Sequence, residues 1–278
     1  MSDATVAALN VYPVKSCRGI TLEEVRVERT GFAGDGVRDR QWMIVDRNGC
    51  FVTQREEPRL ALIEAACVNG ALEVRAPGCD AVRGCESSDS RDVVVWRSNV
   101  RGFDAGDPIA KALSTYLDRD VRLVRFDERK KRRCNPDYVG SSGATTLFAD
   151  GYPILVIGAA SLDDLNARLD EGGMSALPMN RFRPNLVLDG IEPYDEDHAD
   201  TIRIGAVVLK PVKPCVRCEI TTTDQVSTHR GIEPLRTLST YRRNDRLGGV
   251  TFGMNAIVVE GEGARIARGD AAQVTLRF

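Results

Sequence analysis

The first hundred residues alternate between short apolar or β-branched runs and polar turn residues. Asn48 and Gly49, for example, form a two-residue hairpin signal inside one of these runs. The runs are VAALNVYPV (6–14), LEEVRVERT (22–30), RQWMIVDRNGCFVTQ (40–54), ALIEAACV (61–68), ALEVRA (71–76) and RDVVVW (91–96). Many short strands with closely spaced turns are typical of a barrel or a sandwich, so this part of the chain is predicted to be β-rich.

Two later segments show helical spacing instead. The first, DPIAKALSTYLD (107–118), has Asp107 as its predicted N-cap and Pro108 at the first helical position. The second, SLDDLNARLDEGG (161–173), has Ser161 as its predicted cap and stops at a glycine pair. The chain is therefore expected to combine many strands with a few helices.

Strand-like runs return in the second half of the chain. They are Arg122–Phe126, Tyr152–Ile157, Asn185–Leu188, Ala206–Val212, Glu219–Thr223, Asn255–Val259 and Val274–Phe278. We predict a mixed α+β, β-dominated fold, with a β-barrel-like domain over residues 1–120 and a second domain over residues 121–278. The boundary falls between the first predicted helix and the strand that follows it.

Composition narrows the function classes. Lys and Arg total 38 against 40 Asp and Glu, so the formal net charge of −2 gives no electrostatic reason to expect nucleic acid or an anionic membrane as partner. The N-terminal residues lack the basic and apolar regions of a signal peptide, and no stretch approaches the roughly 18 apolar residues of a membrane span. A cytoplasmic location is expected, where cysteines stay mostly reduced.

Eight cysteines against two histidines direct attention to sulfur chemistry. The most distinctive string is PCVRCEITTT (214–223), which contains a single C-x-x-C. A structural zinc site needs two further ligands, preferably a second C-x-x-C or paired histidines, and the sequence offers neither. A redox dithiol normally lies between a strand and a helix, whereas a threonine run typical of a strand follows this pair.

Two other interpretations of the pair stay open. Both cysteines fit ordinary buried positions, where cysteine is common. Alternatively, one thiolate binds a soft, high-valent metal whose other ligands come from a cofactor. Arg217 lies between the two cysteines and favours an ionised thiol, because a nearby positive charge stabilises the thiolate.

Polar side chains also gather at several predicted strand ends. Lys15 and Ser16 follow the first strand, Arg40 precedes another, and Arg183 and Asn185 lie at the start of a third. Guanidinium groups bind phosphate oxygens as a fork, and amide and hydroxyl groups pair with the edge of a polar ring. Together these residues suit a phosphate-bearing heterocycle, although each cluster alone is more typical of solvated surface. No glycine-rich phosphate loop accompanies them.

These strings together resemble the MOSC family of molybdenum-cofactor proteins, in particular the mitochondrial amidoxime-reducing components and bacterial homologues that lack a ferredoxin domain. The resemblance covers nearly the whole chain, and it implies a MOSC N-terminal β-barrel domain followed by the MOSC β-barrel domain. It rests on YPVKSCRGI (12–20), DRQWMIVD (39–46), TQREEPRLALI (53–63), ASLDDLNARL (160–169), RFRPNLVLDG (181–190), PCVRCEITT (214–222), EPLRTLSTYRR (233–243) and FGMN (252–255).

In that family a molybdopterin-based molybdenum cofactor lies between the two domains, and one cysteine binds the metal. The resemblance places this catalytic and metal-ligating role on Cys218 and leaves Cys215 as a support for the loop. The further residues that it implies for cofactor binding are Lys15, Ser16, Arg40, Arg183, Asn185, Arg217, Thr221 and Thr222. Two positions depart from the mitochondrial pattern, Ile191 in place of a cysteine and Asn255 in place of an aromatic residue, and they affect the expected substrate.

The resemblance implies a molybdenum-dependent oxidoreductase that reduces N-hydroxylated small molecules, namely amidoximes, hydroxylamines and N-hydroxylated bases. The chain ends at Phe278 and lacks a plant-type ferredoxin cysteine run, so electrons are expected from a separate protein, a ferredoxin or a flavin reductase. The basic segment Arg129–Arg133, otherwise an exposed loop, is a candidate docking surface for that donor. Two alternatives stay open: a non-catalytic carrier of the cofactor or of sulfur, and a dithiol protein that works without metal.

Overall fold

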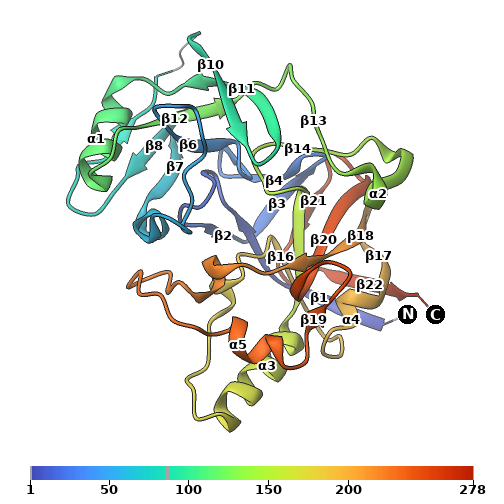
Figure 1. Cartoon of the computed structure of the whole chain (residues 1–278). Coiled ribbons are helices and arrows are strands. Elements are labelled where there is room, and N and C mark those ends of the chain that lie inside the picture. The colour runs from blue at the N-terminus through green and yellow to red at the C-terminus, as the bar shows by residue number, and fades with distance from the viewer. Residues whose placement is uncertain (1, 86–87, 278) are drawn as a thin grey trace.

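A closed β-barrel is built from strands of both halves of the sequence, and the sheets of the N-terminal half lie to one side of it (Figure 1). The structure is a computed structural model that describes residues 2–85 and 88–277. Among these residues, seven strands follow one another around the barrel, and the antiparallel pairing of the first with the last closes it. In barrel order they are β15 (Ile154–Gly158), β16 (Leu186–Asp189), β1 (Ser2–Val11), β22 (Ala271–Leu276), β17 (Ala199–Ile204), β18 (Val207–Val216) and β20 (Gly249–Glu260).

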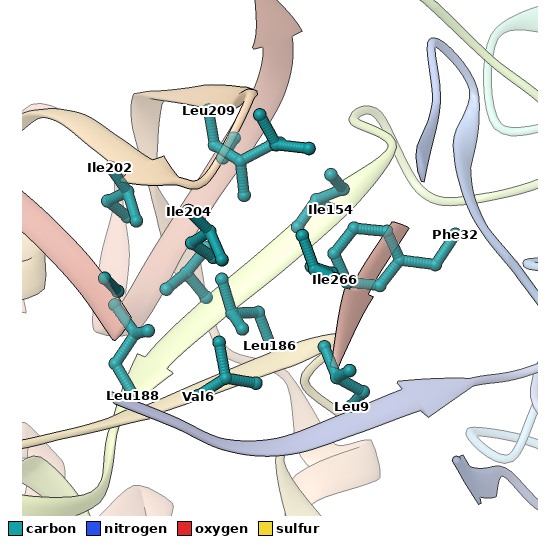
Figure 2. Close-up of a cluster of buried hydrophobic side chains, with 14 of the residues drawn as sticks. Val6, Leu9, Phe32, Ile154, Leu186, Leu188, Ile202, Ile204, Leu209 and Ile266 are labelled. Carbon is teal, nitrogen blue, oxygen red and sulfur yellow. The ribbon is translucent and has the colours of Figure 1, made fainter. Parts of the chain in front are cut away.

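Apolar side chains from these strands fill the barrel (Figure 2). Alternate residues of a strand face the same side, which places Ile202 and Ile204 of β17 together in the core. Val6 and Leu9 of β1 are three positions apart and both buried, because the register of β1 against β16 shifts between Val6 and Ala8. Such a bulge adds one residue and returns the following side chains to the core face.

Smaller sheets lie beside the barrel, and most of their strands come from the N-terminal half. The extra strands β2 (Ile20–Leu22) and β19 (Arg243–Asn244) extend the barrel sheet at β1 and β20. The separate sheets are β10 (Ser90–Val95), β11 (Ser98–Asp104), β12 (Val121–Phe126) and β6 (Trp42–Asp46); β21 (Arg265–Ala267), β3 (Glu24–Glu28), β4 (Gly31–Gly34) and β5 (Val37–Arg38); β7 (Glu64–Val68), β8 (Ala71–Arg75) and β9 (Val82–Arg83); and β13 (Arg132–Arg133) with β14 (Thr145–Thr146). Strands β6, β7, β8 and β12 share with the helix α1 (Asp107–Leu117) a core that is separate from that of the barrel.

Helices are short and few beside the strands, which confirms the predicted β-dominated mixed fold. The α-helices are α1 (Asp107–Leu117), α2 (Pro136–Val139), α3 (Ala159–Glu171), α4 (Asp195–His198) and α5 (Leu235–Ser239). The 3₁₀-helices are η1 (Pro58–Leu62), η2 (Gly140–Ser142), η3 (Met179–Arg181) and η4 (Glu219–Thr222). In the part of the chain that the structure describes, no helix is both long and apolar enough to cross a bilayer.

Strands from both sides of the predicted domain boundary near residue 120 pair in the same sheets. The first strand, β1, belongs to the barrel together with C-terminal strands, and its Ser2 pairs with Val274 of β22. Beyond the boundary, β12 pairs with β6 of the N-terminal half. The division into residues 1–120 and 121–278 stays a prediction.

The two predicted helix caps were wrong by one to three residues. Gly106 precedes α1 and Asp107 is already helical, while Gly158 precedes α3 and Ser161 lies inside that helix. The Ser161 hydroxyl is not a cap because it makes tertiary contacts: it donates to Oε2 of Glu196 at 2.8 Å and accepts the backbone N–H of residue 194.

The predicted strand Glu219–Thr223 was also wrong, because η4 occupies this segment. Thr221 Oγ1 donates to the carbonyl oxygen of Cys218 at 2.9 Å, and Thr222 Oγ1 donates to that of Glu219 at 2.8 Å. These local bonds compete with strand pairing and turn the chain directly after Cys218. They also remove the strand that argued against a redox dithiol. At the C-terminus, β22 ends at Leu276, and the predicted strand residue Phe278 lies outside the described residues.

Candidate functional site

A pocket of ≈ 140 Å³ brings the end of β18 and the turn after it against loops of the N-terminal half. Almost all of the predicted site residues line it: Lys15, Ser16, Arg40, Arg183, Asn185, Arg217, Cys218 and Thr221. Thr222, the remaining one, is buried beside the pocket without lining it, and its hydroxyl is bonded within η4. The cavity is therefore lined by residues as far apart in sequence as Lys15 and Asn255.

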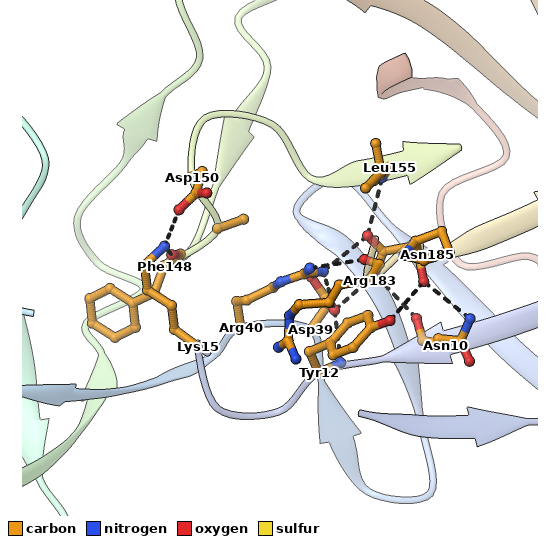
Figure 3. Close-up of polar contacts among 12 residues, drawn as sticks. Asn10, Tyr12, Lys15, Asp39, Arg40, Phe148, Asp150, Leu155, Arg183 and Asn185 are labelled. Carbon is orange, nitrogen blue, oxygen red and sulfur yellow. Dashed lines mark hydrogen bonds and ion pairs between the residues drawn. The ribbon is translucent and has the colours of Figure 1, made fainter. Parts of the chain in front are cut away.

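Lys15 is a buried cation on one wall of the pocket (Figure 3). Its Nζ donates to the carbonyl oxygen of Phe148 at 2.9 Å and forms an ion pair with Asp150. Burial lowers the pKa of Lys15, although the carboxylate of Asp150 opposes the shift. The same carboxylate accepts the indole N–H of Trp96 at 3.1 Å.

Arg40 and Asn185 belong to one hydrogen-bonded network with Asp39 (Figure 3). Nη1 of Arg40 lies 2.7 Å from Oδ2 of Asp39 and 3.0 Å from Oδ1 of Asn185. The Asn185 amide group donates to Oδ1 of Asp39 at 2.9 Å and to the Asn10 carbonyl at 3.1 Å, while its oxygen also accepts the N–H of Leu155. An amide side chain offers two donors and two acceptor sites, so Asn185 is fully used in holding its neighbours.

Arg183 is the least compensated cation of the pocket. Its side chain is almost entirely buried, and Nη2 has no hydrogen-bond partner among the described residues. Its guanidinium lies 4.2 Å from the centre of the Tyr12 ring, over which Arg40 also lies at 4.4 Å. Burial lowers the pKa of Arg183 to about 10. Its Nη1 donates to Oε1 of Gln225 at 3.5 Å, but no carboxylate among the described residues forms an ion pair with Arg183. A buried guanidinium without an ion-pair partner is costly, so this wall of the pocket is suited to an anionic occupant.

Each of the two neighbouring thiols has its own arginine. Arg217 donates to Sγ of Cys215 at 3.0 Å and to the carbonyl oxygen of Phe182 at 2.6 Å, so it contacts the first cysteine. Its Nε is buried without a partner in the described part of the chain. Cys218 instead accepts a hydrogen bond from Nη2 of Arg55, 3.1 Å from its sulfur. All eight cysteines of the chain are free thiols.

Two family descriptions match the chain in sequence order, the MOSC N-terminal beta barrel domain over residues 3–120 and the MOSC domain over residues 144–273. The chain belongs to the MOSC family. Mitochondrial amidoxime reducing component 2 from Bos taurus is 33% identical over 249 residues, and the same component from Rattus norvegicus is 36% identical over 254. Mitochondrial amidoxime-reducing component 1 from Homo sapiens is 33% identical over 258 residues. Each match covers 87% of this chain and 73% of the relative.

Among solved structures, the YUAD protein from Bacillus subtilis covers 99% of this chain and 97% of its own at 11% identity. Its TM-score is 0.42, a likeness too low to support an argument about the site.

Arg55 is the functional candidate of this MOSC protein that sequence reasoning missed. It lines the pocket and contacts Cys218, although it lies in the string TQREEPRLALI, where a charged run is typical of exposed surface. Its place depends on Gln54, whose buried amide pairs with that of Gln225 far along the chain. No local spacing in the sequence signals such a contact.

The two departures from the mitochondrial pattern lie in different environments. Asn255 lines the pocket, and its amide donates to the carbonyl oxygen of Lys213 at 3.2 Å. Ile191 is buried among the apolar residues of the barrel and does not line the pocket. Of these two positions, Asn255 is therefore the one that faces an occupant of the MOSC pocket.

The basic segment Arg129–Arg133 is only partly exposed. Arg132 is buried in β13, and it donates to the carbonyl oxygens of Leu147, at 3.0 Å, and of Ala149. The prediction that the whole run is solvated was wrong at this position, because Arg132 supports the loop that carries Asp150 to the pocket. The exposed members of the segment are Arg129, Lys130, Lys131 and Arg133.

Proposed function

We propose that this MOSC protein is a molybdenum-cofactor-dependent oxidoreductase that reduces N-hydroxylated compounds. The observation that carries the proposal is a partly exposed thiol, Cys218, in a pocket whose walls hold buried cations. A thiolate suits a soft metal, and cations suit the phosphate of a cofactor that supplies the remaining ligands. Relatives whose names describe amidoxime reduction, at 33% and 36% identity, support the same reaction class.

The polar groups of the pocket fit an anionic, phosphate-bearing cofactor. Nη2 of Arg183 and Nε of Arg217 are buried donors without partners among the described residues. Lys15 adds a buried ammonium, and the hydroxyl-bearing Ser16 lies beside it. In the proposed arrangement Lys15, Ser16 and Arg183 hold the phosphate and pterin, and Arg217 binds a further polar group of the pterin.

Cys218 is proposed as the protein's ligand to molybdenum. The turn η4 begins directly after it, and the Thr221 hydroxyl bonded to its carbonyl oxygen fixes the backbone there. Arg40 is held by Asp39 and Asn185, so it presents a fixed cation rather than a mobile one. These residues bind and orient, and the walls formed by Asp150, Asn255 and Ile220 bound the space for the substrate.

The bound cofactor would supply the two-electron redox change. The overall reaction takes an N-hydroxylated compound, two electrons and two protons to the amine or amidine and one water. Because the electrons must come from outside, we propose a separate donor protein, a ferredoxin or a flavin reductase. Lys130, Lys131 and Arg133 are the exposed cations available for docking, since Arg132 is buried and Arg129 forms an ion pair with Asp127. A cytoplasmic location stays a prediction, and the relatives named above carry a mitochondrial name.

The test is turnover by protein that is fully loaded with molybdenum, supplied with an artificial electron donor and a panel of N-hydroxylated compounds. We expect an aromatic amidoxime to be reduced to its amidine, and we expect no reduction by Cys218→Ser. The matched control is Cys50→Ser, which replaces an exposed cysteine and should keep the wild-type rate. Full loading without turnover of any compound would contradict the proposal and favour the carrier role.

A further inference from the structure

Arg55 differs from Lys15 and Arg40, two other cations of the pocket, in its hydrogen-bond partner. Nη2 of Arg55 donates to Sγ of Cys218 at 3.1 Å. Lys15, by contrast, forms an ion pair with Asp150, and Arg40 forms one with Asp39. Among the described residues no carboxylate forms an ion pair with Arg55, although its charge helps that of Lys15 to lower the pKa of Asp150. The side-chain hydrogen bond of Arg55 is made to the Cys218 sulfur.

Several contacts fix Arg55 independently of that sulfur. Its guanidinium carbon lies 4.7 Å from the centre of the Trp96 ring, within the range of a cation–π contact. Its backbone N–H donates to Oγ1 of Thr53 at 3.2 Å. Arg230 donates to the carbonyl oxygen of Arg55 at 2.9 Å and also to that of Gln54. Because these contacts hold the Arg55 donor in place, its hydrogen bond orients the Cys218 thiol.

We propose that Arg55 is a positioning residue for the metal-binding sulfur of Cys218 and that it raises the reduction potential of the metal held there. The proposal rests on the proposed role of Cys218 as a molybdenum ligand. Groups that hydrogen-bond to a metal's ligands orient them, and losing such a group often weakens metal binding or activity by roughly 10- to 100-fold. Hydrogen bonds to a ligating sulfur also set redox potentials in other metal centres.

The direction of the effect follows from charge. An N–H donor and a positive charge both withdraw electron density from the thiolate, and both stabilise the reduced state, which carries more negative charge on the metal centre. Removing Arg55 should therefore lower the potential. Lysine keeps the charge but loses the planar fork that reaches Sγ while lying over Trp96, so Arg55→Lys should give a smaller shift in the same direction.

The experiment compares loaded wild type, Arg55→Gln and Arg55→Lys by potentiometric titration, followed through the paramagnetic resonance signal of the partly reduced metal. We expect a lower potential and an altered signal in Arg55→Gln. The matched control is Arg18→Gln, which removes one charge from an exposed ion pair with Glu64 and should leave both unchanged. Loaded Arg55→Gln with the wild-type potential and signal would overturn the proposal.

Two further measurements test the proposal if the Arg55 variants take up little molybdenum. Trp96→Ala leaves Arg55 and Cys218 in place but frees the guanidinium, so it should shift the potential in the same direction, and a wild-type potential would count against the proposal. In cofactor-free protein, a double-mutant cycle of Arg55→Gln and Cys218→Ser should show coupled unfolding free energies, and additive values would overturn the contact. A wild-type protein that takes up no molybdenum would instead refute the proposed function. The double-mutant cycle needs no metal, so it tests the contact between Arg55 and Cys218 even in that case.

Discussion

Gln54 and Gln225 exchange two hydrogen bonds across 171 positions of sequence. Nε2 of Gln54 donates to Oε1 of Gln225 at 3.1 Å, and Nε2 of Gln225 donates back at 2.9 Å. Nε2 of Gln54 also donates to the carbonyl oxygen of Ser16 at 2.7 Å. This buried amide pair fastens the segment that carries Arg55 to the segment that follows Cys218, so it assembles the pocket from distant parts of the chain.

Replacing one member of the amide pair should destabilise the protein more than its size suggests. In Gln54→Met, the Gln225 amide loses both hydrogen bonds of the pair and keeps those to Thr223 and Arg183, and the carbonyl oxygen of Ser16 loses its donor. The lost bonds cost about 1–3 kcal/mol of the unfolding free energy. The double variant Gln54→Met, Gln225→Met removes both groups, so its loss should be clearly smaller than the sum of the two single losses. Urea unfolding of the three variants measures this, and strictly additive losses would show that the pair does not act as a unit.

The two arginines over Tyr12 should have opposite effects on stability. Arg183→Met removes a buried cation whose pKa burial lowers to about 10, so the cofactor-free protein should become more stable, by on the order of 1 kcal/mol. Arg40→Met leaves the buried carboxylate of Asp39 without its cation and should cost about 3–5 kcal/mol. Both variants should bind less molybdenum. If Arg183→Met destabilised the protein as much as Arg40→Met does, this would contradict the description of Arg183 as a buried cation without an ion-pair partner.

Glu196 should make stability fall as pH rises through the weakly acidic range. Burial raises the pKa of this carboxyl from 4.5 to about 6, and its Oε1 has no partner among the described residues. The folded state therefore keeps a proton that the unfolded state has lost, and stability should drop by roughly 2 kcal/mol between pH 4.5 and a pH above 6. Glu196→Gln should lack this drop relative to wild type. The exposed Glu192→Gln serves as control, and the same slope in wild type and Glu196→Gln would contradict the prediction.

Strand patterns in the sequence predicted the fold class because alternating apolar residues place all the apolar side chains on one face of a strand, and that face packs against a core. The runs around Val6, Ile157 and Val274 all became barrel strands. What the patterns did not contain is which strands pair. The barrel closes through β15 and β20, about 100 residues apart, and β1 joins C-terminal strands.

Local chemistry also overrode local propensity in two places. The threonines after Cys218 have the β-branched shape of strand residues, yet their hydroxyls bond carbonyl oxygens three residues back and form a turn. Arg132 lies in a basic run typical of exposed loops, yet it is buried and donates to the carbonyl oxygens of Leu147, Ala149 and Asp150. Both outcomes depend on partners that single-residue propensities do not include.

In the candidate site, too, some features could be predicted from the sequence and others depend on tertiary contacts. The resemblance pointed to residues that the structure brings into one pocket. Arg55 was missed because its charge alone fits an exposed surface, whereas the Gln54–Gln225 pair, the hydrogen bond from Arg230 and the Trp96 ring hold it beside Cys218. Contacts of this kind are set by tertiary packing, so the sequence pattern does not predict them.

The most direct test of the account is the molybdenum content of protein made in a host that synthesises the cofactor. Elemental analysis should find nearly stoichiometric molybdenum in the wild type and none in Cys218→Ser. Cys215→Ser should keep most of the metal, because its hydroxyl still accepts from Arg217 and the ligand sulfur is untouched. Equal molybdenum in wild type and Cys218→Ser would contradict the central claim that this thiol holds the metal.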